Sequence, residues 1–137
     1  MLFRSVARIA RSGTDLTIAA AGQMVHRALE AADLLAGEGV SCEVIDLRTI
    51  QPLDVDTVAA SVRKTGRLLA VDEAYPRCNL ATDVMALVAR SGNTLNVGCC
   101  TRNTAKPIAP YASAITSDGT RAGSSMLRLV RKCTSKR

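Results

Sequence analysis

Short apolar segments alternate with longer amphipathic segments along most of this chain, from Gly13 to Arg90. The apolar runs are too short for helices and predict buried strands, whereas the segments between them have apolar positions at helical spacing. The strands are expected at Leu16–Ala21, Ser41–Leu47 and Arg67–Val71, and the helices at Gln23–Ala36, Val55–Lys64 and Leu80–Arg90. This order predicts an α/β fold with a largely parallel sheet and right-handed crossovers.

Residues typical of helix ends support these boundaries. Asp54 and Asn79 stand directly before the second and third helices, where a side-chain oxygen accepts hydrogen bonds from free backbone amides. Gly66 follows the second helix, and Gly37 and Gly39 follow the first, where a left-handed backbone conformation favours glycine. We therefore expect all five residues to cap helices.

The regular pattern weakens after Arg90. Leu95–Cys100 predicts a weak fourth strand, and the two prolines of KPIAPYAS predict extended coil. We divide the chain into a lead-in or edge strand at 1–12, an α/β domain at 13–112 and a basic, disordered tail at 113–137.

Composition excludes several classes of protein. No apolar run approaches the roughly 20 residues that span a bilayer, so a membrane protein is not expected. The five cysteines form no C-x-x-C pair, and the one histidine is far from them in sequence, which argues against a zinc site and a disulfide framework. With two Tyr, one Phe and no Trp, the core is expected to be aliphatic.

Charge is distributed unevenly along the chain. Residues 1–89 carry nine Arg and Lys against eleven Asp and Glu, whereas residues 90–137 carry nine against one, so the net charge of +6 arises from the C-terminal part. A basic tail can contact nucleic acid electrostatically, which leaves a binder using residues 102–137 as one alternative. The tail has no interleaved aromatic residues, helix-turn-helix pattern or zinc-finger spacing, so a solvated terminus is favoured.

The first twelve residues, MLFRSVARIARS, are rich in arginine and contain no acid. On a helical wheel they separate basic from apolar side chains, as a mitochondrial presequence does. Short windows produce this pattern by chance, so an ordinary lead-in or edge strand is the favoured interpretation.

Four residues are candidates for a ligand edge or a subunit interface: His26, Asp72, Glu73 and Arg77. Asp72 and Glu73 stand at the C-terminal end of the third strand, the side where α/β sheets bind ligands, although an acid that caps a turn or pairs with Arg77 is the simpler interpretation. His26 has no Ser, Cys or carboxylate motif beside it, so a packing, capping or interface role is expected. Gly22 is a lone glycine where a dinucleotide fold needs G-x-G-x-x-G. We expect no catalytic, cofactor-binding or metal-binding residue.

Two segments, GTDLTIAAAGQMVHRALEAADLLAGEGVSCEVIDLRTIQPLDVDTV and KTGRLLAVDEAYPRCNLATDVMALVA, resemble the C-terminal domain of transketolase-type thiamine enzymes. The resemblance is greatest to the E1 beta subunit of 2-oxo acid dehydrogenase complexes and covers about residues 6–90. VIDLRTIQPLD is its most specific run. DEAYPRCNLATD is most similar to the acetoin dehydrogenase branch, with pyruvate dehydrogenase next.

The resemblance implies a three-layer α/β/α domain with a mostly parallel five-stranded sheet. It also implies that this chain alone binds no cofactor, and that other domains of the complete enzyme hold thiamine diphosphate and magnesium. The implied role is to pack subunits and to help dock the E2 acyltransferase. The implied partners are therefore an E1 alpha-like chain, a beta-like chain and E2.

Two departures from the family pattern qualify this expectation. Only about a dozen residues precede the first core strand, so the family's pyrimidine-binding domain, with its cofactor-activating glutamate, is not expected in this chain. The resemblance fades after Arg90, apart from a faint likeness of Lys106–Ala112 to the family's proline-rich final strand. The basic tail is consistent with a shifted reading frame or a degraded gene.

We therefore expect a truncated E1 beta-like C-terminal domain that serves assembly and E2 docking in a thiamine diphosphate-dependent 2-oxo acid or acetoin dehydrogenase complex. The expected location is the cytoplasm, with the mitochondrial matrix as the alternative. The other hypotheses are a free-standing α/β module that binds a small ligand or anion near Gly22, Arg48 and Glu73, and a non-functional remnant.

Overall fold

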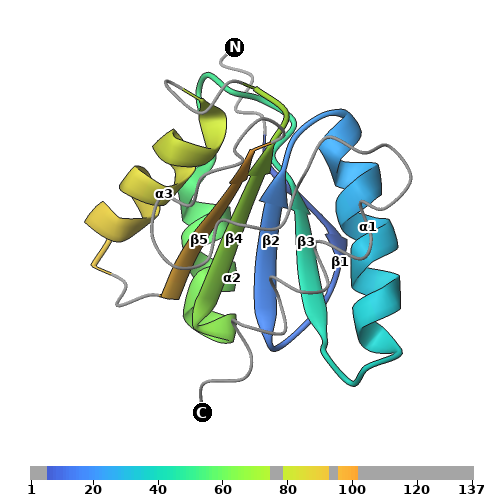
Figure 1. Ribbon diagram of the computed structural model, residues 1–137. Coiled ribbons are helices and arrows are strands. Elements are labelled where there is room, and N and C mark those ends of the chain that lie inside the picture. Colours follow the sequence, from blue (N-terminus) through green and yellow to red (C-terminus); the bar gives the residue numbers. More distant parts are fainter. Residues whose placement is uncertain (1–5, 75–78, 93–95, 102–137) are drawn as a thin grey trace.

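The computed structural model describes residues 6–74, 79–92 and 96–101, the last range by its backbone. The described chain forms three layers, with a central sheet between helices (Figure 1). In chain order the elements are β1 (Arg8–Arg11), β2 (Leu16–Ala20), α1 (Gln23–Ala36), β3 (Cys42–Asp46), α2 (Val55–Thr65), β4 (Arg67–Asp72), α3 (Leu80–Arg90) and β5 (Asn96–Thr101). The strands and helices predicted between residues 16 and 100 are all present, and their ends differ from the prediction by one residue at most.

The sheet has five strands in the order β1-β3-β2-β4-β5. β2 pairs in parallel with β3 and β4, so that Ile18 lies opposite Val44 on one side and Leu69 on the other. β5 continues the parallel sheet beyond β4, whereas β1 runs antiparallel to β3 at the opposite edge. The predicted three-layer α/β/α fold with a mostly parallel five-stranded sheet is confirmed.

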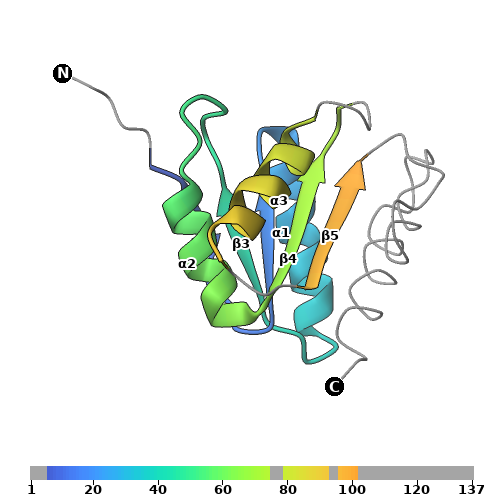
Figure 2. The same ribbon diagram turned by 90° about the vertical axis from the view of Figure 1, so that its left-hand side faces the viewer.

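The two faces of the sheet have separate aliphatic cores. Because side chains alternate along a strand, Ile18 faces α1 whereas Ala19 faces the opposite layer. α1 covers the first face, and α2 and α3 together cover the second, as the turned view shows (Figure 2). Strands buried on both faces consist of continuous apolar runs, which explains the pattern of LTIAA in β2.

Four of the five predicted caps are present, three of them at the ends of α2 and α3. The Asp54 carboxylate accepts the Thr57 amide at 3.2 Å, and the Asn79 side chain accepts the Thr82 amide at 2.8 Å. Gly66 ends α2 with φ 69°, in the left-handed region that glycine tolerates best. Asp54 and Asn79 therefore mark the starts of α2 and α3, and Gly66 marks the end of α2, as predicted.

The prediction that Gly37 adopts a left-handed conformation is wrong. Gly37 has φ −62°, because one further turn follows it and the left-handed residue is Gly39, with φ 82°. The Gly39 amide donates to the Ala36 carbonyl at 3.1 Å, and the Val40 amide donates to the Leu35 carbonyl at 3.0 Å. This pair of bonds is a Schellman motif, in which Gly39 alone requires the positive φ.

The segment before the first parallel strand is attached to both helical layers. The Ala7 amide donates to Asp54 Oδ2 at 2.9 Å, which ties the segment to the start of α2. On the other face, the Arg11 guanidinium of β1 forms an ion pair with Asp33 of α1. None of the helices in the described ranges is long and apolar enough to cross a membrane. The predictions for Arg77, for Lys106–Ala112 and for the tail at 113–137 lie outside the described residues.

Candidate functional site

The strand order has a switch point between β2 and β4, the place where α/β sheets of this kind bind ligands. From β2 the chain passes through α1 to β3, and from β4 it passes through α3 to β5 on the other side of the sheet. The carboxyl ends of β2 and β4 are neighbours at this switch in direction. Crossovers that diverge in this way leave an opening outside the strand ends, where ligands bind in doubly wound sheets.

Asp72 stands at this opening, but its carboxylate is occupied by the backbone. Oδ1 accepts the Ala74 amide at 3.1 Å, and Oδ2 accepts the Leu80 amide at 2.9 Å. Asp72 therefore fixes the turn after β4 and the first residue of α3. Glu73, the next residue, is exposed at the same edge. The structure thus gives Asp72 the turn-capping contacts that the sequence offered as the simpler interpretation.

The other predicted positions follow the carboxyl ends of β2 and β3 or lie in α1. Gly22, with φ 57°, follows β2 at the start of α1, and Arg48, with φ 59°, follows β3. Positive φ at Arg48 is unusual for a residue with a side chain. The side chain of His26, in α1, is exposed. Within the described ranges, no three His, Cys, Asp or Glu side chains are grouped as a metal site requires.

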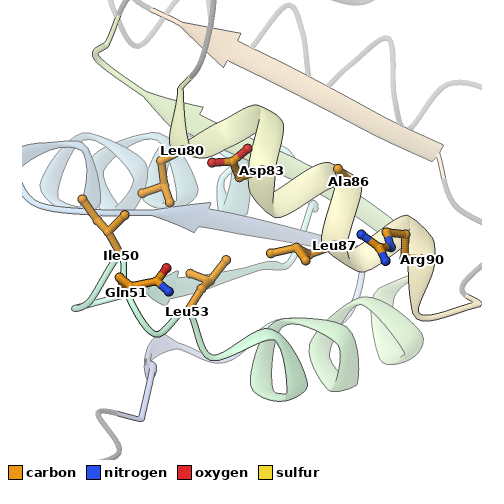
Figure 3. Close-up of a pocket in the computed structure, with 8 residues that line it drawn as sticks. All are labelled: Ile50, Gln51, Leu53, Leu80, Asp83, Ala86, Leu87 and Arg90. Carbon is orange, nitrogen blue, oxygen red and sulfur yellow. The ribbon is translucent and has the colours of Figure 1, made fainter.

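A shallow groove lies nearby, between the loop after β3 and α3. Its volume is about 330 Å³. Ile50, Gln51 and Leu53 of the loop face α3 across the groove (Figure 3). Ile50 is 66% exposed, the largest exposed fraction among the big apolar side chains in the described part of the chain. The lining combines apolar and charged side chains: Ile50, Leu53, Leu80, Leu87, Asp83 and Arg90. Such a surface suits contact with another protein better than it suits a small polar ligand.

A buried polar network that the sequence analysis missed lies at the amino ends of the strands. The Glu43 side chain of β3 is 1% exposed and faces α2. Its carboxylate accepts hydrogen bonds from Ser61 and Lys64 of α2 and, at 3.3 Å, from the Gly13 amide. Burial alone raises the pKa of Glu43, but the hydrogen bonds from Lys64, Ser61 and Gly13 and the charge of Lys64 outweigh it, so the pKa is lowered.

Hydroxyl groups extend this network to the neighbouring strands. Thr17 Oγ1 of β2 lies 2.7 Å from Ser61 Oγ and 2.7 Å from Thr65 Oγ1, and the Thr65 hydroxyl donates to the Arg67 carbonyl of β4 at 3.0 Å. No buried side-chain polar atom in the described chain lacks a partner. The network therefore holds α2 against three strands, which is a structural role. Its sequence signal is an acid within an apolar strand, together with Ser61, Lys64 and Thr65 at i, i+3 and i+4 on one face of the following helix.

The layered fold and the opening at the carboxyl ends of β2 and β4 define a doubly wound α/β domain. Residues 5–116 match the family model for the transketolase C-terminal domain, and the chain belongs to this family. The resemblance inferred from VIDLRTIQPLD and its surroundings is thereby confirmed.

The most similar relatives include beta subunits of two dehydrogenases. The chain is 53% identical over 108 residues to the acetoin:2,6-dichlorophenolindophenol oxidoreductase subunit beta of Cupriavidus necator, covering 76% of this chain and 32% of that protein. It is 52% identical over 80 residues to the pyruvate dehydrogenase E1 component subunit beta of Bacillus subtilis, covering 58% of this chain and 25% of that protein. The chain thus spans a third or less of these relatives and is homologous to their C-terminal region.

Solved structures show the same fold at lower identity. A split-gene transketolase, described as an inactive beta4 tetramer, has a TM-score of 0.76 and 23% identity over 96% of this chain and 42% of that chain. A 2-oxoglutarate:ferredoxin oxidoreductase from Magnetococcus marinus has a TM-score of 0.63 over 95% of this chain and 20% of that chain. At 23% and 13% sequence identity, the two likenesses show the fold alone.

The described residues do not fit thiamine diphosphate with magnesium. A diphosphate needs several convergent amide or cationic donors, and its magnesium needs oxygen ligands. α1 begins at a single glycine without a side-chain cap, and Asp72 is already engaged by two amides. The groove beside α3 is lined largely by aliphatic side chains. We therefore assign no step of thiamine chemistry to this part of the chain.

Proposed function

We propose that this chain acts as the C-terminal domain of an E1 beta component in a 2-oxo acid or acetoin dehydrogenase complex, and that its work is assembly. The observation that carries this proposal is the identity of about half of the aligned residues to acetoin and pyruvate dehydrogenase beta subunits. Identity at this level over a whole domain supports conservation of the surfaces that face other subunits, as well as the core.

The groove beside α3 is the surface that supports an assembly role. Exposed Ile50 and half-buried Leu53, Leu80 and Leu87 place apolar area next to solvent. Apolar area with a charged rim is typical of a protein–protein contact. We assign this surface to contact with an E1 alpha-like chain, a beta-like chain or the E2 acyltransferase.

Thiamine diphosphate and magnesium belong to the assembled enzyme in this proposal and are held by other domains. The proposed location is the cytoplasm, with the mitochondrial matrix as the alternative. We therefore expect this chain to affect the assembly and the stability of the complex. We expect turnover only when its partners are present.

A second candidate function is supported by the backbone at the sheet edge. Gly22 and Arg48 both have positive φ, and together with Glu73 they follow the carboxyl ends of β2, β3 and β4. Unusual backbone at the switch point of a doubly wound sheet favours a small-ligand or anion site. This function predicts saturable binding by the isolated chain, whereas assembly predicts partner-dependent stability.

Reconstitution tests the assembly role. The chain is co-expressed with an E1 alpha-like subunit and a separate pyrimidine-binding domain from the acetoin dehydrogenase branch, and the mass of the product is measured by light scattering during gel filtration. We expect a multi-subunit particle with thiamine diphosphate-dependent acetoin or 2-oxo acid turnover.

A matched pair of variants then locates the contact. Ile50→Lys places a charge in the groove and is expected to abolish the particle, whereas Leu34→Lys, at a 53% exposed position on α1, is expected to leave it intact. A wild-type chain that never joins its partners would exclude the assembly role. Equal effects of the two substitutions would exclude the groove as the contact.

A further inference from the structure

Residues 6–11, here called the strap, run along the edge of the sheet and contact both helical layers. At one end the Ala7 amide donates to Asp54 Oδ2 at 2.9 Å, and the buried Ala7 side chain packs in the core on the α2 side of the sheet. At the other end the Arg11 guanidinium pairs with Asp33 of α1. In the turned view the dark blue first end of the strap meets the start of α2 (Figure 2). Ala7 therefore ties the strap to α2.

The loop at residues 48–53, here called the wall, forms one side of the groove beside α3. Ile50, Gln51 and Leu53 of the wall face α3 (Figure 3). Arg48, at the start of the wall, has φ 59°, a conformation that is unfavourable for a residue with a side chain. Strained backbone of this kind persists only where the surrounding structure holds it. The shape of the wall therefore depends on contacts with the rest of the domain.

Asp54 joins the strap to the wall. It follows Leu53 directly, and its carboxylate accepts the Thr57 amide through Oδ1 and the Ala7 amide through Oδ2. The Ala7 side chain also belongs to the core cluster against which Leu53 packs. One carboxylate and one apolar core therefore hold together the strap, the start of α2 and the last residue of the wall.

We propose that the strap controls the groove: its bond to Asp54 holds the wall in the shape that binds a partner, and displacement of the strap loosens the wall and weakens that binding. The effect on partner binding rests on the assembly role proposed above, whereas the coupling between strap and wall does not. This chain matches the C-terminal region of its relatives, so in those proteins the preceding part joins the domain at the segment that corresponds to the strap. A movement of the preceding part then reaches the groove through Ala7 and Asp54.

Hydrogen exchange of the isolated 137-residue chain tests the coupling. The reporter is the Thr49 amide in the wall, which donates to the Leu47 carbonyl at 2.6 Å. Ala7→Pro removes the amide donor of the strap and leaves Asp54 in place, so it is expected to speed exchange at Thr49 by about tenfold. Asp33→Asn releases the other end of the strap, on the opposite face of the sheet, and is expected to change exchange at Thr49 by less than about twofold.

A second variant of the same contact guards against misfolding of the proline variant. Asp54→Asn keeps a residue that caps helices well, but its single side-chain oxygen cannot serve both the Thr57 amide and the Ala7 amide. This variant is therefore also expected to speed exchange at Thr49. Circular dichroism checks that each variant is folded.

Coupling between two sites is reciprocal, which provides a test in the opposite direction. Leu53→Ala loosens the wall and is expected to speed exchange of the Ala7 amide by about fivefold or more. Leu87→Ala, on the α3 side of the groove, is the matched control. Leu87 is not among the described residues of the core cluster that contains Ala7, so this control is expected to leave exchange at Ala7 unchanged.

The coupling would be overturned by exchange at Thr49 that both strap variants leave unchanged, or by exchange at Ala7 that the two leucine variants alter equally. In the reconstituted particle described above, Ala7→Pro is expected to weaken assembly by roughly tenfold although every side chain of the groove is retained. Assembly at wild-type affinity would overturn the control of partner binding. Failure of the proposed function is seen separately, as a wild-type chain that joins no partner while the exchange results hold.

Discussion

Replacing Glu43 with Gln removes one negative charge from the buried network and changes the shape of the side chain very little. In the wild-type chain this carboxylate accepts hydrogen bonds from Gly13, Ser61 and Lys64 in a site that is almost closed to water. The amide can still accept through one oxygen, and the Ser61 hydroxyl can rotate to accept from the new NH₂ group. The variant therefore keeps most of the hydrogen bonds but loses the negative charge that strengthens them.

The expected cost follows from the exposure of each partner. The bonds from Ser61 and Gly13 are buried, and a bond to a charged group exceeds a neutral one by about 1 kcal/mol each. The Lys64 side chain is 48% exposed, so its ion pair with Glu43 is screened by water and adds about 0–1 kcal/mol. We expect Glu43→Gln to lower the free energy of unfolding by about 2–3 kcal/mol at neutral pH.

The cost should depend on pH in a defined direction. The pKa of Glu43 is lowered in the folded chain, so the carboxylate stabilises the fold fully at pH values above the pKa of an unfolded-chain glutamate, about 4.3. The stabilisation is lost as the pH falls below that value and through the lowered pKa. The difference between wild type and Glu43→Gln in the free energy of unfolding is therefore expected to narrow as the pH falls below about 5.

Urea unfolding followed by circular dichroism measures both effects. Asp33→Asn is the matched control, because it removes the carboxylate of the Arg11–Asp33 pair on the surface, where the Asp33 side chain is 76% exposed. The control is expected to change the free energy of unfolding by less than about 0.5 kcal/mol. An effect of Glu43→Gln no larger than this, or one that grows on acidification, would refute the reasoning.

Three further predictions concern backbone approach, capping and a buried thiol. A Cβ at Gly13 would lie 2.2 Å from the Cys42 carbonyl carbon, so Gly13→Ala should lower the unfolding midpoint in urea strongly. Gly66→Ala should lower the midpoint far less, because it adds only left-handed backbone strain of about 1–2 kcal/mol. Asp54→Ala removes the cap of α2 and the acceptor of the Ala7 amide. It should lower the free energy of unfolding by about 2 kcal/mol and should speed hydrogen exchange of the Ala7 amide. Burial raises the pKa of Cys42 to about 11, so this thiol should resist iodoacetamide at pH 8 until urea unfolds the chain, as mass spectrometry of its peptide would record.

Each of these predictions has a result that would contradict it. Equal midpoints for the two glycine variants would mean that the backbone near Gly13 can move apart at little cost. For the cap, Asn79→Ala is the control, since it removes the cap of α3 and should leave exchange at Ala7 unchanged. Exchange at Ala7 that responds equally to both cap variants would contradict a specific bond to Asp54. Native labelling of Cys42 at the rate of the unfolded chain would contradict its burial.

Local signals in the sequence were sufficient to predict most of the fold. The bounds of α1 and α3 agree with the prediction because apolar periodicity and the caps at Gly39 and Asn79 act within a few residues of each helix end. The error at Gly37 has the same local origin, since two nearby glycines compete for one left-handed position and only the hydrogen bonds of the turn decide between them.

The sites depended on contacts that the sequence does not make visible. Glu43 was assigned to a strand, but its role requires α2 to place Ser61 and Lys64 over that strand. Ile50 lies between a predicted strand and a predicted helix, and the sequence alone does not show that it is exposed next to α3. Asp72 lies at the end of a strand, as its place in the sequence indicated, but only the structure shows that two amides occupy its carboxylate.

The central claim is that this chain works as an assembly domain of an E1 beta component. The most direct test is affinity capture of the 137-residue chain from its native extract, with mass-spectrometric identification and quantification of the captured proteins and with the Ile50→Lys variant as the control. The account predicts that an E1 alpha-like subunit or an E2 acyltransferase is recovered in a fixed ratio with the wild-type chain and is lost with the variant. Recovery of the wild-type chain as a lone species, with no dehydrogenase component above the level of the variant, would contradict it.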